Sequence, residues 1–482
     1  MGPGADRVPH ERTGQSGGEV SLNRTETSDA ESLVATWVAQ VSLPEIPQAA
    51  LSVARTCIAD GLGVMLAGTR SPVFAQCATL PRPAGRCNVS DGGPCTDAAT
   101  AALLNGAACH ALDFDDTCYA GIVHGTAVVL PAVLAVAQEV NATGEQLLEA
   151  FIAGVETVYA LGLAVTDSLY ERGFWATGTL GVIGAAAGAA RLLGLDAGGV
   201  AHAIRLAANV PVGLRATHGS SGKAYLCGVA AKLGVESAYA AKAGIQGQTG
   251  TFERHRGFAS THNGGLLRRE ALQALGTRYA LVDPGIAFKL RPLCSATQAA
   301  IDATIALRSQ NDFEAQDVET VVCRGTALVV SSLPHHSPSR PGEAQFSMAF
   351  AIACTLLHGD VRLDHLTDST LADGQMKRLM ERIELLEDAT LVRPEAALAC
   401  PEAARVDVVL RDGRRLQCTV MAATGMPQQP ATELQLQAKF MDCAMRAVGV
   451  LEAGELCNRA RRIDEVAKVR LLFHGLLPAG RT

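Results

Sequence analysis

An excess of positive charge is absent from this sequence, which has 41 Lys and Arg against 48 Asp and Glu. Charged residues make up 18% of the 482 positions, and the formal net charge is −7. Proteins that bind nucleic acid usually carry a basic surface, so this balance argues against nucleic acid and favours a small-molecule partner. Because 48% of the residues are hydrophobic, the chain can bury a large core and does not have the composition of a disordered protein.

Closely spaced cysteine pairs are also absent. The 14 cysteines are scattered, and no two follow the Cys-x-x-Cys spacing that builds many zinc and iron–sulfur sites. We therefore expect reduced cysteines that act as small core residues. We predict neither a metal nor another cofactor.

A secretory signal and a membrane span are not predicted either. The first twenty residues, MGPGADRVPHERTGQSGGEV, lack the apolar segment that a signal peptide needs. The most apolar stretches, 121–140 and 179–195, contain His, Pro, Gly or Arg in an amphipathic context, which is unusual for a transmembrane helix. We expect a cytoplasmic protein with no membrane partner.

The pattern of apolar residues divides the chain into four parts. Residues 1–29 are rich in Gly, Ser and charge and are predicted to form a disordered N-terminal tail. Residues 30–273 have helical periodicity and predict a helical domain, whereas residues 274–425 mix strand and helix patterns and predict a smaller α+β lid domain. Residues 426–482 are predicted to form a C-terminal helical segment that returns to the helical domain. The predicted fold class is therefore mainly α.

Two segments carry the helical prediction. TGEQLLEAFIAGVETVYAL opens with a capping box between Thr143 and Gln146. Its apolar stripe consists of Leu147, Phe151, Val155 and Val158. The segment GTLGVIGAAAGAARLLGL has almost no side chain on one face, so we expect a buried helix with neighbours packed closely against its small residues.

The lid is predicted from a change to strand periodicity. DVETVVCRGT and ARVDVVLRDGRRLQCTVMA alternate apolar and polar residues, as half-buried strands do. In the second segment, Asp412-Gly413 predicts a two-residue hairpin turn between a strand that ends with Leu410 and one that contains Leu416. Helical stretches such as EAQFSMAFAIACTLLHG lie between the strands, which is typical of an α+β unit.

The stretch HALDFDDTCYAGIVHG, residues 110–125, concentrates two histidines and three aspartates. Three interpretations are open. The aspartates can form a solvated turn in which Asp116 or Thr117 caps the following segment. His110, Asp113 and His124 can bind a metal, although their spacing matches no familiar metal motif. Finally, His124 can act as an acid or base near neutral pH when a carboxylate orients its ring.

Motifs along the whole chain resemble a single family. They begin with HALDFDDT, a following His-Gly and AVVLPAVLAVAQ, and continue with GAAAGAARLLGL, GKAYLCGVAAKLGVESAYAAKAGIQG, FKLRPLCSATQAAIDA, PSRPGEAQFSMAFAIACTLLHG, LRDGRRL, GMPQQP and KFMDCA. Together, from Ser32 to Val450, they resemble the MmgE/PrpD family, which includes 2-methylcitrate dehydratase, cis-aconitate decarboxylase and iminodisuccinate epimerase. The resemblance implies a large all-helical domain and a smaller α+β lid, with the active site between them, usually in a homodimer.

The resemblance also implies catalytic residues. Asp113 and Thr117 match the family's Asp-Phe-Asp-Asp-Thr motif, and His124 matches the histidine that follows it. Lys223 and Lys289 match its two active-site lysines. The chemistry agrees, because lysines can anchor the carboxylates of a di- or tricarboxylic acid. His124 can then remove a proton next to a carboxylate, and Asp113 is predicted to orient its imidazole.

The chain departs from the family at two positions. Trp175 and Gln298 stand where histidines are common, and neither side chain can shuttle a proton. We predict that both line the substrate site. If Trp175 faces the cleft, its indole favours an acid less polar than cis-aconitate. If it packs in the core instead, it has no bearing on the substrate.

The predicted function is that of a metal-independent lyase. It would dehydrate or decarboxylate a small di- or tricarboxylic acid after removal of a proton next to a carboxylate. An epimerase or isomerase that uses the same base is an alternative, since both reactions start with the same proton abstraction. A second alternative is a catalytically impaired paralogue that binds a carboxylate.

Overall fold

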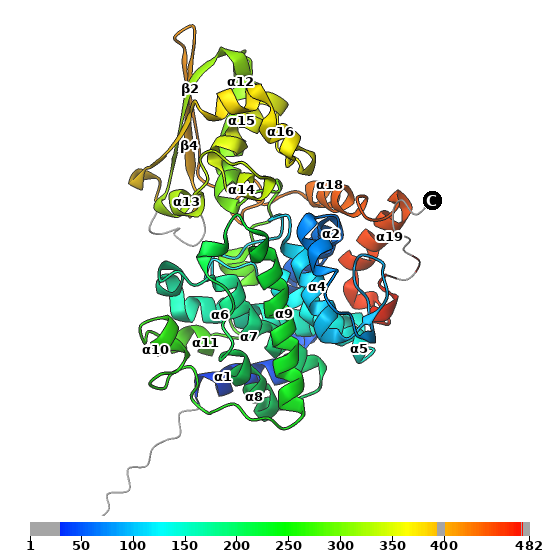
Figure 1. Cartoon of the computed structure of the whole chain (residues 1–482). Helices are drawn as coiled ribbons and strands as arrows, with labels where there is room; N and C mark the ends of the chain where they lie inside the picture. Colours follow the sequence, from blue (N-terminus) through cyan, green and yellow to red (C-terminus); the bar gives the residue numbers. More distant parts are fainter. Residues whose placement is uncertain (1–28, 393–400, 474, 476–482) are drawn as a thin grey trace, which may run out of the picture.

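Helices form the body of the molecule, and a small sheet lies at one end of it (Figure 1). This computed structural model describes residues 29–392, 401–473 and 475. The predicted disordered tail, residues 1–29, lies outside the described residues except for Asp29. The Asp29 carboxylate accepts a hydrogen bond from the Ser32 N–H and caps the first helix.

The larger part of the molecule is helical. Its helices are α1 (Ala30–Gln40), α2 (Gln48–Gly68), α3 (Pro72–Cys77), α4 (Ala98–His110), α5 (Gly125–Glu139), α6 (Gly144–Glu171), α7 (Ala176–Leu192), α8 (Ala197–Ala207), α9 (Ser221–Lys242), α10 (Phe258–His262) and α11 (Arg269–Gln273), with a short strand, β1 (Ala84–Cys87). Near the C-terminus, α18 (Glu433–Ala444) and α19 (Val450–Arg461) both pack against α2. The predicted mainly α fold class is confirmed.

Close packing between α6 and α7 depends on small residues. The predicted capping box is present at the start of α6, where Thr143 and Gln146 each accept a hydrogen bond from the other's backbone N–H. On α7, a Cβ atom at Gly184 would overlap with Val158 Cγ2 of α6 and lie 2.5 Å from the carbonyl oxygen of Gly154. The two helices can therefore approach this closely only because position 184 has no side chain.

The smaller α+β part is built on a four-stranded mixed sheet. Its strands are β2 (Val318–Gly325), β3 (Ile383–Glu387), β4 (Ala404–Leu410) and β5 (Arg415–Val420), in the order β3-β2-β4-β5. β2 and β3 are parallel, and the other two pairs are antiparallel. Its helices are α12 (Gln298–Gln310), α13 (Ala327–Ser332), α14 (Pro341–Ala344), α15 (Met348–His358), α16 (Asp368–Ala372) and α17 (Gly374–Met380). α12 and α15 pack against each other and against the sheet.

The β4–β5 hairpin has the predicted register but a longer turn. Val408 pairs with Leu416, which places the apolar residues of both strands on one face. Leu410 donates its N–H to the Arg414 carbonyl, so three residues rather than two connect the strands. Gly413 has a φ of 87°, which is the left-handed residue that a three-residue hairpin requires. The prediction of a two-residue turn was wrong for this reason.

Two large clusters of buried side chains divide the molecule. The first contains side chains between Ala30 and Ile286 and returns with Phe440 through Leu472. The second runs from Ala287 to Met426 and includes Tyr119 from the N-terminal part. The core thus changes later in the chain than the predicted division after residue 273.

In the part of the chain that the structure describes, two helices are long and apolar enough to cross a membrane by length and composition alone. These are α2 and the stretch Gly144–Val165 of α6, whose apolar windows are 72% and 89% buried inside the protein. Such burial is the pattern of core helices in a helical protein.

Candidate active site

The loop after α4 turns its carboxylates inward. Asp113 has a left-handed backbone conformation with a φ of 48°, which is uncommon outside Gly, Asn and Asp. Asp113, Asp115 and Asp116 are only 3%, 0% and 2% exposed. Asp116 accepts a hydrogen bond from Thr126 Oγ1, and burial raises its pKa to about 7. The interpretation of this stretch as a solvated turn is therefore wrong.

Asp113 lies between the two predicted lysines. Lys223, in the first turn of α9, places Nζ 2.5 Å from Asp113 Oδ1. Lys289 places Nζ 3.0 Å from Asp113 Oδ2 and donates to the Asp113 carbonyl oxygen at 2.8 Å. Burial acts to raise the pKa of Asp113, but Lys223 and Lys289 outweigh it and hold that pKa well below its usual range. Residues that are far apart in sequence thus form one buried charged group.

A different aspartate orients His124. His124 Nδ1 lies 3.2 Å from Asp115 Oδ2 and 2.9 Å from the Asp116 carbonyl oxygen. Both neighbours are acceptors, so Nδ1 must carry the proton, and Nε2 is left with a free lone pair. The prediction that Asp113 orients this ring is wrong, because the left-handed turn at Asp113 directs its carboxylate to the lysines and leaves Asp115 beside the imidazole.

Thr117 fixes the backbone around His124. Its Oγ1 lies 3.3 Å from His124 Nδ1, and its N–H donates to the Ala287 carbonyl oxygen at 2.9 Å. The His124 N–H in turn donates to Thr177 Oγ1 at 3.1 Å. The predicted Thr117 therefore lies at the site and links the histidine loop to the chain that leads to Lys289.

His110 shares the Asp115 carboxylate with His124. His110 Nδ1 lies 2.8 Å from Asp115 Oδ2, and the two imidazole centroids are 4.8 Å apart. Burial is the main reason why the pKa of His110 is lowered to about 4. His110 Nε2 and Asp115 Oδ1 are buried without a hydrogen-bond partner among the described residues. The ring is therefore neutral at pH 7 with an uncommitted acceptor.

Metal-type donors do converge here, although in a different set from the predicted one. Nitrogen and carboxylate atoms of His110, Asp115 and His124 lie within 4.8 Å of one another, whereas Asp113 is engaged by two lysines. Both Nδ1 atoms already bond to one Asp115 oxygen, which orients the rings as a hydrogen-bonded group. All cysteines that the structure describes are free, and most are buried.

Trp175 packs behind the charged group. It precedes α7, is 2% exposed, and belongs to the larger core. Its ring centroid lies 5.5 Å from that of His110 and 6.0 Å from Lys223 Nζ. It is not among the residues that line the cavity beside Lys223. Of the two alternatives for Trp175, the packing therefore matches the core position, and its predicted place in the substrate lining is not supported.

Gln298 is committed to the main chain. Its Oε1 accepts from the Arg291 N–H at 3.3 Å, and its Nε2 donates to the carbonyl oxygens of Arg291 and Leu293 at 3.2 and 3.4 Å. Both ends of the amide are thus used, and the side chain is 3% exposed. Gln298 does not line the cavity beside Lys223, and its contact with substrate stays a prediction. It fixes the backbone that follows Lys289.

The lid contributes an aromatic ring that the sequence did not indicate. Phe346 stacks on His218 with ring centroids 5.3 Å apart and an interplanar angle of 12°. The same ring lies 4.9 Å from Lys223 Nζ. Burial, with the Lys223 charge as a lesser cause, lowers the pKa of His218 to about 3. Phe346 therefore closes the site from the lid side, opposite the start of α9.

A second buried acid lies behind Lys289. Glu402 accepts hydrogen bonds from the hydroxyl groups of Tyr119 and Ser295, the latter at 3.0 Å. Burial raises the pKa of Glu402 to about 7. No sequence pattern connects residues 283 positions apart, so this group could not be predicted. It ties the histidine loop to the segment that leads into β4.

A cavity of about 500 Å³ opens beside the charged group. It lies between the helical part and the lid, and its lining includes His110, Asp113, Lys223, Phe346 and Ser220, which precedes α9. Its size is within the range of small-molecule sites. Of the predicted catalytic residues, Asp113 and Lys223 line this cavity, whereas His124, Lys289 and Thr117 do not.

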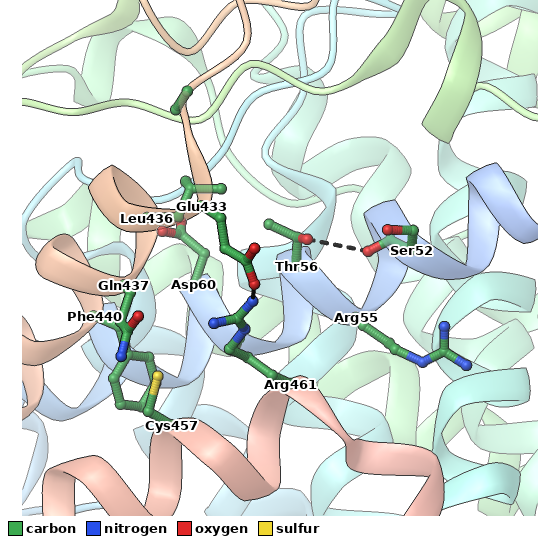
Figure 2. A pocket seen from close by; sticks show the side chains of 12 residues that line it. Ser52, Arg55, Thr56, Asp60, Glu433, Leu436, Gln437, Phe440, Cys457 and Arg461 are labelled. Atoms are coloured by element: carbon green, nitrogen blue, oxygen red, sulfur yellow. Dashed lines mark hydrogen bonds and ion pairs between the residues drawn. The ribbon is translucent and has the colours of Figure 1, made fainter.

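Another cavity, of about 370 Å³, lies between α2, α18 and α19 (Figure 2). Each of its charged side chains has an ionic partner: Arg461 pairs with Glu433 inside the lining, while Arg55 pairs with Asp464 and Asp60 pairs with Lys439 at 2.7 Å outside it. Because each charge is already neutralised by its partner, this cavity has less positive charge available for an anionic ligand than the cavity beside Lys223 has.

A helical part and a smaller α+β part that enclose a buried charged site define the class of protein. The match to models of known protein families identifies which family this chain belongs to. The MmgE/PrpD N-terminal domain matches residues 32–268, and the MmgE/PrpD C-terminal domain matches residues 292–464. The chain belongs to the MmgE/PrpD family.

Curated relatives cover most of the chain at low identity. Cis-aconitate decarboxylase from Homo sapiens is 24% identical over 381 residues, which are 77% of this chain and 78% of that protein. Cis-aconitate decarboxylase from Aspergillus terreus is 25% identical over 471 residues, covering 91% and 94%. The cis-aconitate decarboxylase-like protein oryM from Aspergillus oryzae is 25% identical over 465 residues, covering 91% and 95%. Family and relatives together support a lyase-type role in general.

Proposed function

We propose that this protein is a metal-independent lyase for a small di- or tricarboxylic acid. In dehydration, the base removes a proton next to a carboxylate, and the neighbouring hydroxyl group takes up a proton and leaves as water. In decarboxylation, the bond to carbon dioxide breaks first, and a proton is delivered to the carbanion that remains. The observation that carries the proposal is the pair of buried lysines joined through Asp113, next to a histidine whose Nδ1 is bound by Asp115. Cations beside an oriented base are the groups that this chemistry needs.

Each residue has a separate task in this proposal. Lys223 lines the cavity and meets the substrate carboxylate, while Lys289 stabilises negative charge from behind. Burial acts to lower the pKa of Lys289, but Asp113 and Asp115 outweigh it and raise the pKa above its usual value. Lys289 therefore remains a cation at neutral pH. His124 accepts the proton at Nε2, because Asp115 keeps the proton on Nδ1.

Proton NMR in deuterated water tests the proposal directly. The protein is incubated with a panel of di- and tricarboxylic acids, and the signals of each acid are followed. New vinylic signals or released carbon dioxide are expected from a lyase. Deuterium exchange without loss of a group would instead identify an epimerase. Unchanged spectra, combined with binding of the same acids, would identify a carboxylate-binding paralogue.

We further propose a cytoplasmic homodimer. Val450 and Leu451, at the start of α19, are 62% and 82% exposed, which is costly for adjacent large apolar side chains unless a partner covers them. Light scattering of the purified protein should therefore give the mass of two chains. The mass of one chain at micromolar concentration would contradict the dimer.

A further inference from the structure

The cavity beside Lys223 has one charged end. His110, Asp113 and Lys223 line it there, together with Ser220 and Ser221 at the beginning of α9. His110 Nε2 is buried and has no partner among the described residues. The exposed backbone N–H groups at a helix start favour an anion. This end of the cavity therefore suits the carboxylates of the substrate.

Much of the remaining lining is apolar and comes from both parts of the molecule. It includes Pro72, Val73 and Leu112 from the helical part, and Phe346, Leu363 and Leu366 from the lid. Leu112 and Leu363 pack against one small buried cluster that contains Val64 and Phe114. The two parts thus build one continuous apolar region next to the charged end.

Two of the cations farther along the lining are paired with carboxylates, and a third, Arg70, donates hydrogen bonds to the carbonyl oxygens of Arg446 and Ala447. Arg446 lies 2.7 Å from Asp364, and Arg340 lies 2.6 Å from Glu343. Arg340 is largely exposed, so it marks the side of the cavity that faces solvent. A second set of carboxylates would have to displace these partners, whereas an apolar group would not.

We infer that the substrate is a polycarboxylic acid with a hydrocarbon arm of several carbons. Its carboxylates meet Lys223, and its arm lies along Val73, Leu112 and Leu366. A cavity of about 500 Å³ lies within the range of about 300–1,000 Å³ that is typical of larger, drug-sized ligands. A small tricarboxylate would leave the apolar lining in contact with water. This inference rests on the proposed lyase function and locates the preference for an apolar substrate away from Trp175.

The test is a homologous series of acids. The value of kcat/KM is measured for cis-aconitate and for homologues that carry a methyl, butyl or hexyl substituent. Each buried methylene should raise kcat/KM about three- to fourfold until the cavity is full. Values that stay constant or fall with arm length would overturn the inference.

Two variants locate the arm. Leu366→Asn should remove most of the gain in kcat/KM that the butyl and hexyl arms give, because burial of methylene groups against this residue is lost. Leu386→Asn is the matched control, because Leu386 lies on β3, is 38% exposed and does not line the cavity. Equal effects of both variants on all acids would contradict the assigned lining.

Calorimetry separates this inference from the proposed function. Tricarballylate and its alkyl homologues are saturated acids that contain no group to eliminate. Their affinity should rise with arm length whether or not the protein is a lyase. If no acid in either series reacts but affinity still rises with arm length, the proposed lyase function is refuted, whereas the inferred binding site for the hydrocarbon arm is supported. If the acids react but neither kcat/KM nor affinity depends on arm length, the lyase function is supported and only the inferred binding site for the arm is refuted.

Discussion

At the scale of single residues, the reactivity of the site depends on one oxygen atom. Asp115 Oδ2 lies 2.8 Å from His110 Nδ1 and 3.2 Å from His124 Nδ1. The Asp115 pKa lies well below its usual range, because the two histidines outweigh the effect of burial. The carboxylate therefore stays ionised at neutral pH and fixes both rings in the tautomer that leaves Nε2 free.

Replacement of His124 or Asp115 tests this arrangement. His124→Ala should lower kcat/KM by about two to four orders of magnitude, the usual contribution of one general base. Asp115→Asn should also lower kcat, because the Asn amide can donate to Nδ1 and shift the proton to Nε2. The exposed His336→Ala is the control and should leave kcat unchanged. If His124→Ala keeps activity within a few-fold and circular dichroism shows an intact fold, the base lies elsewhere.

Chelation tests whether the three converging donors hold a metal. Prolonged incubation with a strong chelator, followed by gel filtration, should leave kcat unchanged, because both Nδ1 atoms are committed to Asp115 and two lysine cations lie close by. Activity and metal content are measured before and after. Loss of activity that added metal restores would overturn the metal-independent mechanism.

The positions of Asp113, Thr117, His124, Lys223 and Lys289 at one site could be predicted, whereas their partners could not. Resemblance identifies positions, but the choice between Asp113 and Asp115 depends on a single backbone angle, the φ of 48° at Asp113. Successive side chains in an irregular loop have no fixed period, so sequence spacing does not assign their directions. For Trp175 and Gln298 the same limit applies, because burial and backbone hydrogen bonds decide their roles.

At the scale of elements, helix packing was the most predictable feature. The apolar stripe and capping box of α6 depend on local chemistry, and both are present. The turn between β4 and β5 was less predictable, because Asp-Gly occurs in two-residue and three-residue hairpins. Only the pairing of Leu410 with Arg414 distinguishes the two.

The close approach of α6 and α7 gives a stability prediction. Gly184→Ala should lower the free energy of unfolding by about 1–3 kcal/mol, because the added methyl group overlaps with Val158 and α7 must shift. Gly454→Ala in α19 is the matched control, since a Cβ atom there meets nothing within 4 Å. It should raise stability by about 0.5–1 kcal/mol through helix propensity. Chemical denaturation measures both. Equal changes in the two variants would show that the α6–α7 contact does not restrict position 184.

At the scale of the whole molecule, the two parts are joined at the site through buried polar groups. Tyr119 belongs to the loop before α5 but packs in the core of the lid, where its hydroxyl donates to Glu402. Because burial raises the Glu402 pKa from 4.5 to about 7, this carboxyl is largely protonated in the folded protein at pH 6 and ionised in the unfolded chain. The connection between the two parts therefore depends on pH.

The sign of that dependence follows from proton uptake. Between about pH 4.5 and 7 the folded protein holds a proton on Glu402 that the unfolded chain has released, so this group's contribution to stability falls as pH rises. Asp116 and Glu156 act in the same direction, because burial also raises each pKa to about 7. His110 and His218 act in the opposite direction, because their pKa values are lowered. The contribution of Glu402 is therefore isolated by comparing the free energy of unfolding of wild type with that of a Glu402 variant at each pH.

Glu402→Gln provides that comparison, because the Gln carbonyl can still accept from Tyr119 but the side chain does not titrate. The variant should gain stability relative to wild type as pH rises from 5 to 7.5, by up to about 3 kcal/mol for a pKa change of this size. The free energy of unfolding is measured by urea denaturation at each pH. Glu384→Gln, at an exposed position on β3, should run parallel to wild type. If Glu402→Gln also runs parallel to wild type, Glu402 has an ordinary pKa in the folded protein, and its bond with Tyr119 joins the two parts independently of pH.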